Sequence, residues 1–151
     1  MCRESKKDND LFFVCSLIDY IGRKTKNERK LVVNSIGKEE MEHIYELADV
    51  YHCENIDKVS DELIVKANIE IGNFDNVAQC IYRIPTHWDI GKVYKRLIKM
   101  VSNVKNISVI DALFEVYHSF ISEKIDDYNS SVYYENPQYI FHSFMEGKLL
   151  D

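Results

Sequence analysis

Residues 84–99 read Ile-Pro-Thr-His-Trp-Asp-Ile-Gly-Lys-Val-Tyr-Lys-Arg-Leu-Ile-Lys, and this stretch decides the fold class. Thr86 and Asp89 have the T-x-x-D spacing of a capping box, which is typical of a helix N-terminus. Apolar residues then recur at intervals of three and four: Ile90, Val93, Leu97, Met100 and Val101. The stretch therefore predicts an amphipathic helix over residues 87–101.

The predicted helix also carries a basic face. Its basic side chains occupy positions i, i+3, i+4 and i+7, which share one side of a helix: Lys92, Lys95, Arg96 and Lys99. The chain has a net charge of −6, whereas residues 82–106 hold six basic residues and one acidic residue. A basic face on an acidic protein either binds a partner or pairs with acidic helices of the same chain, and the sequence leaves both possibilities open.

Apolar spacing and capping residues predict helices along the rest of the chain as well. The expected ranges are 10–21, 28–36, 39–52, 56–67, 108–128 and 137–146. Gly22 is expected to end the first of these helices, and Asn27 to cap the second. Residues 76–84 fit a helix or a strand, and we favour a helix because a lone strand has no partner. The sequence thus predicts an all-α protein, with one compact domain of seven or eight helices over residues 1–151.

Several classes of protein are excluded by what the sequence lacks. The cysteines Cys2, Cys15, Cys53 and Cys80 form no C-x-x-C pair, which argues against a zinc ribbon and a disulfide scaffold and favours reduced thiols in the cytoplasm. The apolar run 11–18 is too short to span a membrane, and no signal peptide is evident. No P-loop, G-x-G-x-x-G, G-x-S-x-G or H-E-x-x-H motif occurs, so we expect no catalytic residues, no metal and no cofactor.

Two similar segments, 47–52 and 113–118, each place a carboxylate three residues before a histidine: Asp49 with His52, and Glu115 with His118. Di-iron bundles use this spacing on two helices, together with a Glu from each of two other helices. Asp19 and Glu146, the residues that would have to complete such a site here, are poorly placed. Hydrogen-bonded pairs at helix margins are the favoured interpretation, and a metal-dependent enzyme is a distant alternative.

Two further groups of residues are candidates for binding. His87 and Trp88 lie in the first turn of the predicted helix 87–101, where they could hold an anion or stack on a base, although Trp88 also suits a core position. Tyr133, Tyr134 and Tyr139 belong to an aromatic cluster near the C-terminus. Tyrosine combines apolar area with a polar tip, which suits a protein interface as well as the margin of a core.

Part of the chain, about residues 12–64, resembles a known family. The matching residues are Phe13-Val14, Ile18-Asp19-Tyr20, Ile44-Tyr45, Tyr51-His52 and Asp61-Glu62. This pattern is similar to that of a short uncharacterised bacterial helical family, whose members are often encoded beside ADP-ribosyltransferase-like toxin candidates. The resemblance implies a helical accessory or antitoxin-like protein without catalytic residues.

Taken together, these features predict a non-enzymatic protein that binds and regulates a protein partner. The predicted binding residues are the basic face, the His87–Trp88 turn and the three late tyrosines. The main alternative is a binder of nucleic acid or a phosphorylated ligand through Lys92, Lys95, Arg96 and Lys99. The pI of about 5.4 counts against a dedicated nucleic-acid binder.

Overall fold

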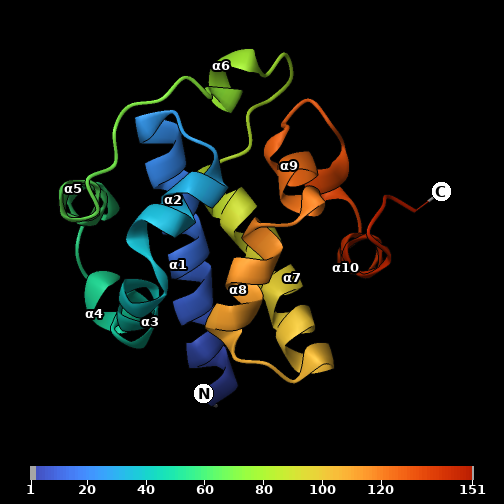
Figure 1. The fold of residues 1–151 in the computed structure, drawn as a ribbon, viewed down its shortest axis with the longest axis horizontal. Coiled ribbons are helices and arrows are strands. Elements are labelled where there is room, and N and C mark those ends of the chain that lie inside the picture. Colours follow the sequence, from blue (N-terminus) through green and yellow to red (C-terminus); the bar gives the residue numbers. More distant parts are fainter. Residues whose placement is uncertain (1–2, 151) are drawn as a thin grey trace.

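The computed structural model describes residues 3–150, which form ten α-helices and one short 3-10 helix joined by loops (Figure 1). Their bounds are α1 (Arg3–Thr25), α2 (Arg29–Ile36), α3 (Lys38–Glu46), α4 (Ala48–Tyr51), α5 (Ile56–Lys66), α6 (Asn76–Gln79), α7 (His87–Lys105), α8 (Val109–Tyr117), α9 (Phe120–Asp126), η1 (Val132–Tyr134) and α10 (Pro137–Glu146). Eight of the α-helices have seven or more residues, and the described residues contain no strand. The predicted all-α domain is therefore confirmed.

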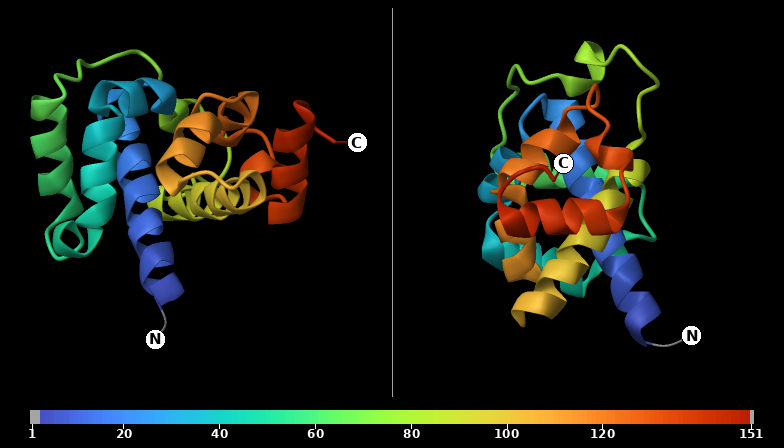
Figure 2. Two further views of the ribbon diagram at one scale, coloured as in Figure 1. Left: turned by 60° about the horizontal axis from the view of Figure 1, so that its bottom comes forward. Right: turned by 90° about the vertical axis from the view of Figure 1, so that its right-hand side faces the viewer.

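The centre of the fold is the pair formed by α1 and α7, the two longest helices. Figure 2 shows α3–α5 on one side of α1 and α7–α10 on the other, while α2 crosses the C-terminal end of α1. Gly91 allows α7 to approach α1 closely, because a Cβ atom at this position would lie 2.1 Å from Ser16 Oγ. Apolar side chains from both helices, among them Val14, Ile18, Ile90 and Ile98, are fully buried and form the middle of the core.

The N-terminus of α7 has the predicted capping box. Thr86 Oγ1 accepts a hydrogen bond from the Asp89 backbone N–H at 3.0 Å, and Asp89 Oδ2 accepts one from the Thr86 N–H at 2.9 Å. The helix continues beyond the predicted residue 101 and ends at Asn106, which adopts the left-handed conformation. None of the helices in the described part of the chain combines the length and apolar composition that crossing a bilayer requires.

The predicted helix 10–21 is longer in the structure, where α1 covers Arg3–Thr25, and three other predicted helices are divided or shortened. The predicted helix 39–52 is divided into α3 and α4 at Leu47, and the predicted helix 108–128 into α8 and α9 at residues 118–119. At the second break Ser119 is extended, and its hydroxyl donates to the Val116 carbonyl at 2.6 Å, which satisfies an acceptor at the end of α8. The predicted helix 76–84 ends at Gln79, because Cys80 turns into an extended segment.

Gly22 and Asn27 also have roles other than those expected. Gly22 lies inside α1, where it makes room for a side chain: a Cβ atom there would lie 2.3 Å from Arg29 Cδ. The N-cap of α2 is Glu28 rather than Asn27. The Asn27 side-chain amide instead donates to the Glu70 carbonyl at 2.8 Å and so holds the loop after α5 against the end of α1.

Candidate functional site

The basic face of α7 divides into two parts. Lys95 and Lys99 lie on the side of α1, where Lys99 Nζ contacts Asp8 Oδ2 at 2.8 Å and burial lowers the pKa of the half-buried Lys95. Lys92 and Arg96 are exposed and form no ion pair with any residue that the structure describes. The charge that α7 offers to a partner therefore comes mainly from Lys92 and Arg96.

His87 and Trp88 lie where α7 begins, against α1. The Trp88 ring packs on Phe12 with centroids 5.5 Å apart and remains 36% exposed, so it is only in part a core residue. His87 is half-buried between Tyr20 and Trp88, and burial, followed by the charge of Arg23, lowers its pKa. A neutral His87 contributes no charge to anion binding.

The extended segment before α7 exposes several apolar side chains. Ile81 is 77% exposed, Tyr82 is 66% exposed, and Ile84 also faces solvent. The segment is held on the chain after α9, because Asn129 Oδ1 accepts from the Ile81 N–H at 2.9 Å and the Asn129 amide donates to the Gln79 carbonyl at 3.0 Å. Hydrogen bonds thus hold the start of this segment, at Gln79 and Ile81, while the side chains of Ile81, Tyr82 and Ile84 stay unburied.

The 3-10 helix η1 completes this surface. The rings of Tyr133 and Tyr134 meet edge to face, and Tyr134 is 69% exposed. A groove of about 110 Å³ separates η1 from α7, and Arg96 lines it together with both tyrosines. Tyr139 is not among its lining residues; its hydroxyl donates to the Leu150 carbonyl at 2.9 Å. We call residues 81–84, Trp88, Lys92, Arg96, Tyr133 and Tyr134 the α7–η1 surface.

The second basic segment of the sequence, residues 23–30, is mostly used within the protein. Arg23 and Arg29 both contact the buried Asp19, at 2.7 and 2.9 Å. Lys24 bonds to Asp57 and Asp61 of α5. Lys26 Nζ lies 4.0 Å from Asp75 Oδ2. Lys30 is therefore the exposed cation of this segment without an ion pair to a described residue.

The two His–carboxylate pairs lie apart in the fold, and their members have other partners. Asp49 contacts Lys6 at 3.4 Å, and Glu115 contacts Lys105 at 2.7 Å. His118 bonds through its two ring nitrogens to the Phe114 carbonyl and to Asn34. Among the described residues, no group of three or more His, Cys, Asp or Glu side chains is arranged to hold a metal ion.

A buried polar cluster was not identified in the sequence. Arg29 is completely buried, and its guanidinium donates to Asp19, to Asn76 Oδ1 at 3.2 Å and to the Tyr128 hydroxyl at 3.2 Å. Asn76 in turn donates to the Asp126 carbonyl at 2.8 Å. The sequence does hold one indication of this cluster. Asp19 follows Leu11 and Cys15 at intervals of four residues, which places a carboxylate on the buried apolar face of α1.

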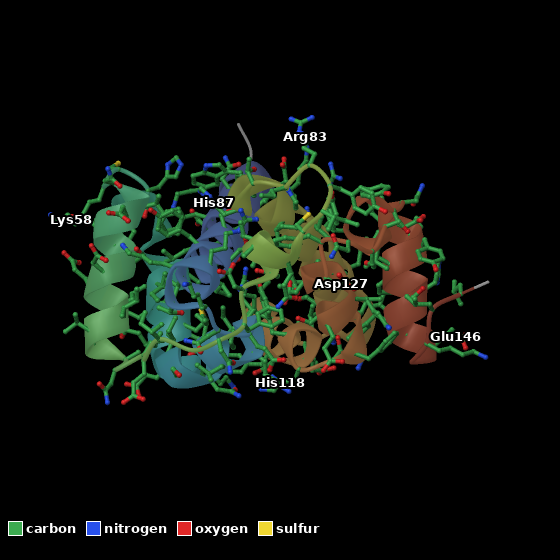
Figure 3. All side chains as sticks on the ribbon, turned by 90° about the horizontal axis from the view of Figure 1, so that it is seen from above. Lys58, Arg83, His87, His118, Asp127 and Glu146 are labelled. Carbon is green, nitrogen blue, oxygen red and sulfur yellow. The ribbon has the colours of Figure 1, made fainter. Side chains whose placement is uncertain are left out.

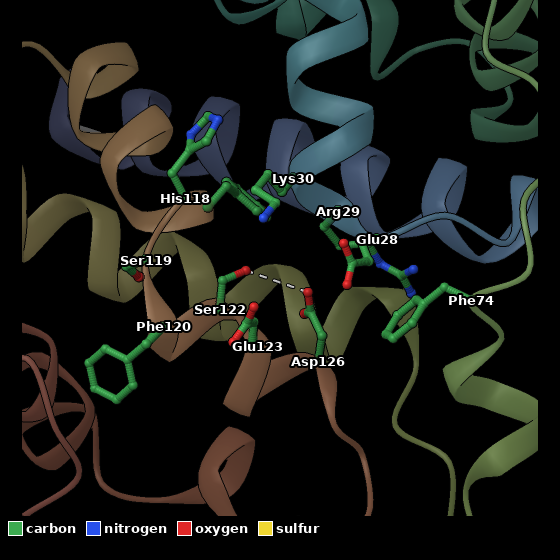
Figure 4. Close-up of a pocket in the computed structure, with 11 residues that line it drawn as sticks. Glu28, Arg29, Lys30, Phe74, His118, Ser119, Phe120, Ser122, Glu123 and Asp126 are labelled. Carbon is green, nitrogen blue, oxygen red and sulfur yellow. Dashed lines mark hydrogen bonds between the residues drawn. The ribbon is translucent and has the colours of Figure 1, made fainter.

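Beside this cluster, a cavity of about 390 Å³ opens between the start of α2 and the α8–α9 junction (Figure 4). Asp126 lines it and is 5% exposed. Its Oδ1 accepts from the Tyr94 hydroxyl at 2.8 Å, and burial raises its pKa to about 7 even though Arg29 opposes the shift. Figure 3 shows His118, at the rim of this cavity, and Arg83, which belongs to the α7–η1 surface, at opposite edges of the molecule.

No family model matches this chain, and no curated protein and no solved structure is detectably similar to it. The resemblance over residues 12–64 therefore stays a prediction.

Proposed function

We propose that this protein binds another protein through the α7–η1 surface and has no catalytic step of its own. One observation carries the proposal: large apolar side chains stay exposed on a backbone that hydrogen bonds hold in place. The exposed fractions of Ile81, Tyr82 and Tyr134 are 77%, 66% and 69%. A gathering of such side chains beside polar residues is typical of interaction sites.

The composition of the surface indicates what kind of partner it suits. Tyrosine, tryptophan and arginine are enriched at the energetic centres of protein interfaces, and Trp88, Tyr134 and Arg96 supply all three here. Lys92 and Arg96 are exposed cations without an ion pair among the described residues. Complementary charge would steer an acidic partner to this surface.

Nucleic acid fits the same observations less well. Binding to phosphates depends on the number of cations that can reach the backbone. The 23–30 segment does not extend the basic area, because Arg23, Lys24 and Arg29 pair with aspartates of this chain. The chain's net charge of −6 would further oppose a polyanion.

Affinity capture from the source cells tests this proposal. We expect a partner protein to be retained by the wild type, and its recovery to fall about tenfold or more, roughly 1.4 kcal/mol of binding, with Ile81→Ser/Tyr134→Ser. Lys92→Glu/Arg96→Glu should reduce recovery mainly at low salt, because exposed charges act through screened attraction. The fold should be unchanged in both variants, as judged by circular dichroism, because these side chains are exposed.

Matched variants elsewhere serve as controls. Val65→Ser removes an 80% exposed apolar side chain from α5, and Lys148→Glu reverses an exposed charge after α10. Both should capture the partner as well as the wild type does. Equal capture by all variants would contradict the proposal. Nucleic acid recovered instead of protein, and lost with Lys92→Glu/Arg96→Glu alone, would establish the phosphate-binding alternative.

A further inference from the structure

The cavity between α2 and the α8–α9 junction is separate from the α7–η1 surface and is large enough for a small organic molecule. Its walls come from three parts of the chain: residues 28–30 at the start of α2, residues 117–126 of α8 and α9, and Phe74 from the loop before α6. Phe74, Tyr117 and Phe120 provide aromatic area, and the remaining lining residues are polar.

Oxygen atoms dominate the polar lining. Figure 4 shows the carboxylates of Glu28 and Asp126 and the hydroxyl of Ser122 directed toward the same space. Ser122 Oγ lies 3.5 Å from Asp126 Oδ2. Glu123 is exposed at the rim, and neither Glu28 nor Glu123 forms an ion pair with a described residue. Three carboxyl groups therefore face one cavity.

The positive groups around the cavity do not balance these carboxyl groups. Arg29 is fully buried and shares the Asp19 carboxylate with Arg23, at 2.9 and 2.7 Å. His118 uses both ring nitrogens, one of them with Asn34 at 2.7 Å. Of the lining residues, Lys30 is the exposed cation without an ion pair to a described residue. With Asp126 ionised, three cations in and beside the cavity face four carboxylates: Arg23, Arg29 and Lys30 against Asp19, Asp126, Glu28 and Glu123. A positively charged ligand would supply the missing charge.

We propose that this cavity binds a small organic cation: an amine whose ammonium group lies between Asp126, Glu28 and Glu123. An ammonium group can donate three hydrogen bonds, and the two oxygens of each carboxylate can accept them. The aromatic rings of Phe74 and Tyr117 would contact the body of the ligand and favour its positive charge. The buried Tyr94–Ser122–Asp126 contacts hold the central carboxylate in place before the ligand enters.

Amide NMR titrations at millimolar ligand test this proposal with defined probes. The probes are 1,4-diaminobutane and benzylamine, and 1,4-butanediol and benzyl alcohol are their uncharged counterparts. We expect at least one amine to shift amide signals of residues 28–30 and 118–126, and the two alcohols to bind far more weakly. Failure of both amines to shift these signals, or equal binding of an amine and its alcohol, would overturn the proposal.

Three variants are expected to change the amine affinity in opposite directions. Loss of folding could only weaken binding, so it cannot produce this pattern. Removing a negative charge with Glu123→Gln or Asp126→Asn should weaken amine binding by about fivefold or more, and removing the positive charge with Lys30→Met should tighten it by about threefold. Glu123 is exposed, so its variant folds normally. Lys148→Met, at an exposed position after α10 and outside both the cavity and the α7–η1 surface, is the matched control and should leave the affinity unchanged.

An anion gives the decisive counter-test. If inorganic phosphate shifts the same amide signals and Lys30→Met abolishes that effect, the cavity is an anion site and the proposal is wrong. Phosphate without effect, together with tighter amine binding by Lys30→Met, would support it.

Discussion

Replacing Arg29 by methionine is expected to lower the free energy of unfolding by about 3 kcal/mol. Arg29 and Asp19 are both buried, and their atoms Nε and Oδ1 lie 2.9 Å apart. Removing the guanidinium leaves the Asp19 carboxylate in the core with Arg23 as its remaining positive partner. The Asn27 carbonyl and Asn76 Oδ1 would also lose a donor. Buried polar groups without partners are costly, which explains the size of the effect.

Urea denaturation at pH 7, followed by circular dichroism, measures this loss. Arg96→Met is the matched control, because Arg96 is exposed and should change stability by less than about 0.5 kcal/mol. The double variant Asp19→Asn/Arg29→Met should recover part of the loss, since it removes a buried carboxylate that has lost one of its two arginine partners. If Arg29→Met is as stable as the wild type, the ion pair contributes no net stability and this explanation is wrong.

The caps and glycines of this chain show which parts of the fold local sequence patterns predict and which they do not. Caps that depend on two or three neighbouring residues were predictable, because Thr86 and Asp89 form the expected capping box. Gly22 does not end α1 as expected. A glycine is required there because the Arg29 side chain packs against it, and Arg29 reaches Gly22 only after the chain has turned. Local spacing cannot show that a glycine makes room for a distant side chain.

The candidate sites were also predictable only where local spacing determines them. The helical spacing placed Lys92, Lys95, Arg96 and Lys99 on one face of α7, but it could not show that Lys99 contacts Asp8, 91 residues earlier. Because residues 76–84 were expected to form a helix, the exposed positions of Ile81 and Tyr82 were not predicted. The cavity was not predictable at all, because it joins Glu28 to Asp126 across most of the chain. These contacts depend on how helices pack, which the periodicity of one helix does not record.

Asp126→Asn is expected to remove a large dependence of stability on pH. Burial raises the pKa of Asp126 from 3.8 to about 7 in the folded protein. The folded state therefore binds this proton more tightly than the unfolded state does. The stabilisation of the folded state by the protonated Asp126 carboxyl is complete below pH 3.8, decreases as the pH rises toward 7, and is lost above pH 7. The full difference is up to about 4 kcal/mol, at 1.36 kcal/mol for each unit of pKa.

The groups around Asp126 are consistent with this direction. Arg29 lowers its pKa, whereas Asp19 raises it, and Tyr94 and Ser122 hydrogen-bond to the carboxylate. Glu28 and Glu123 add negative charge from the cavity side, and Lys30 opposes them. An asparagine can still accept the hydrogen bond from the Tyr94 hydroxyl, so Asp126→Asn keeps this contact while it removes the ionisation.

The quantity to compare is the difference in free energy of unfolding between the variant and the wild type at each pH. Contributions from carboxylates that both proteins share cancel in this difference. Urea denaturation from pH 4 to pH 8 should show Asp126→Asn gaining stability over the wild type as the pH rises, with the difference levelling off above pH 7. Asp127→Asn, at the exposed neighbouring position, should run parallel to the wild type. Parallel curves for Asp126→Asn would mean that the ionised carboxylate costs nothing in this cavity, and the reason for an amine to bind there would disappear.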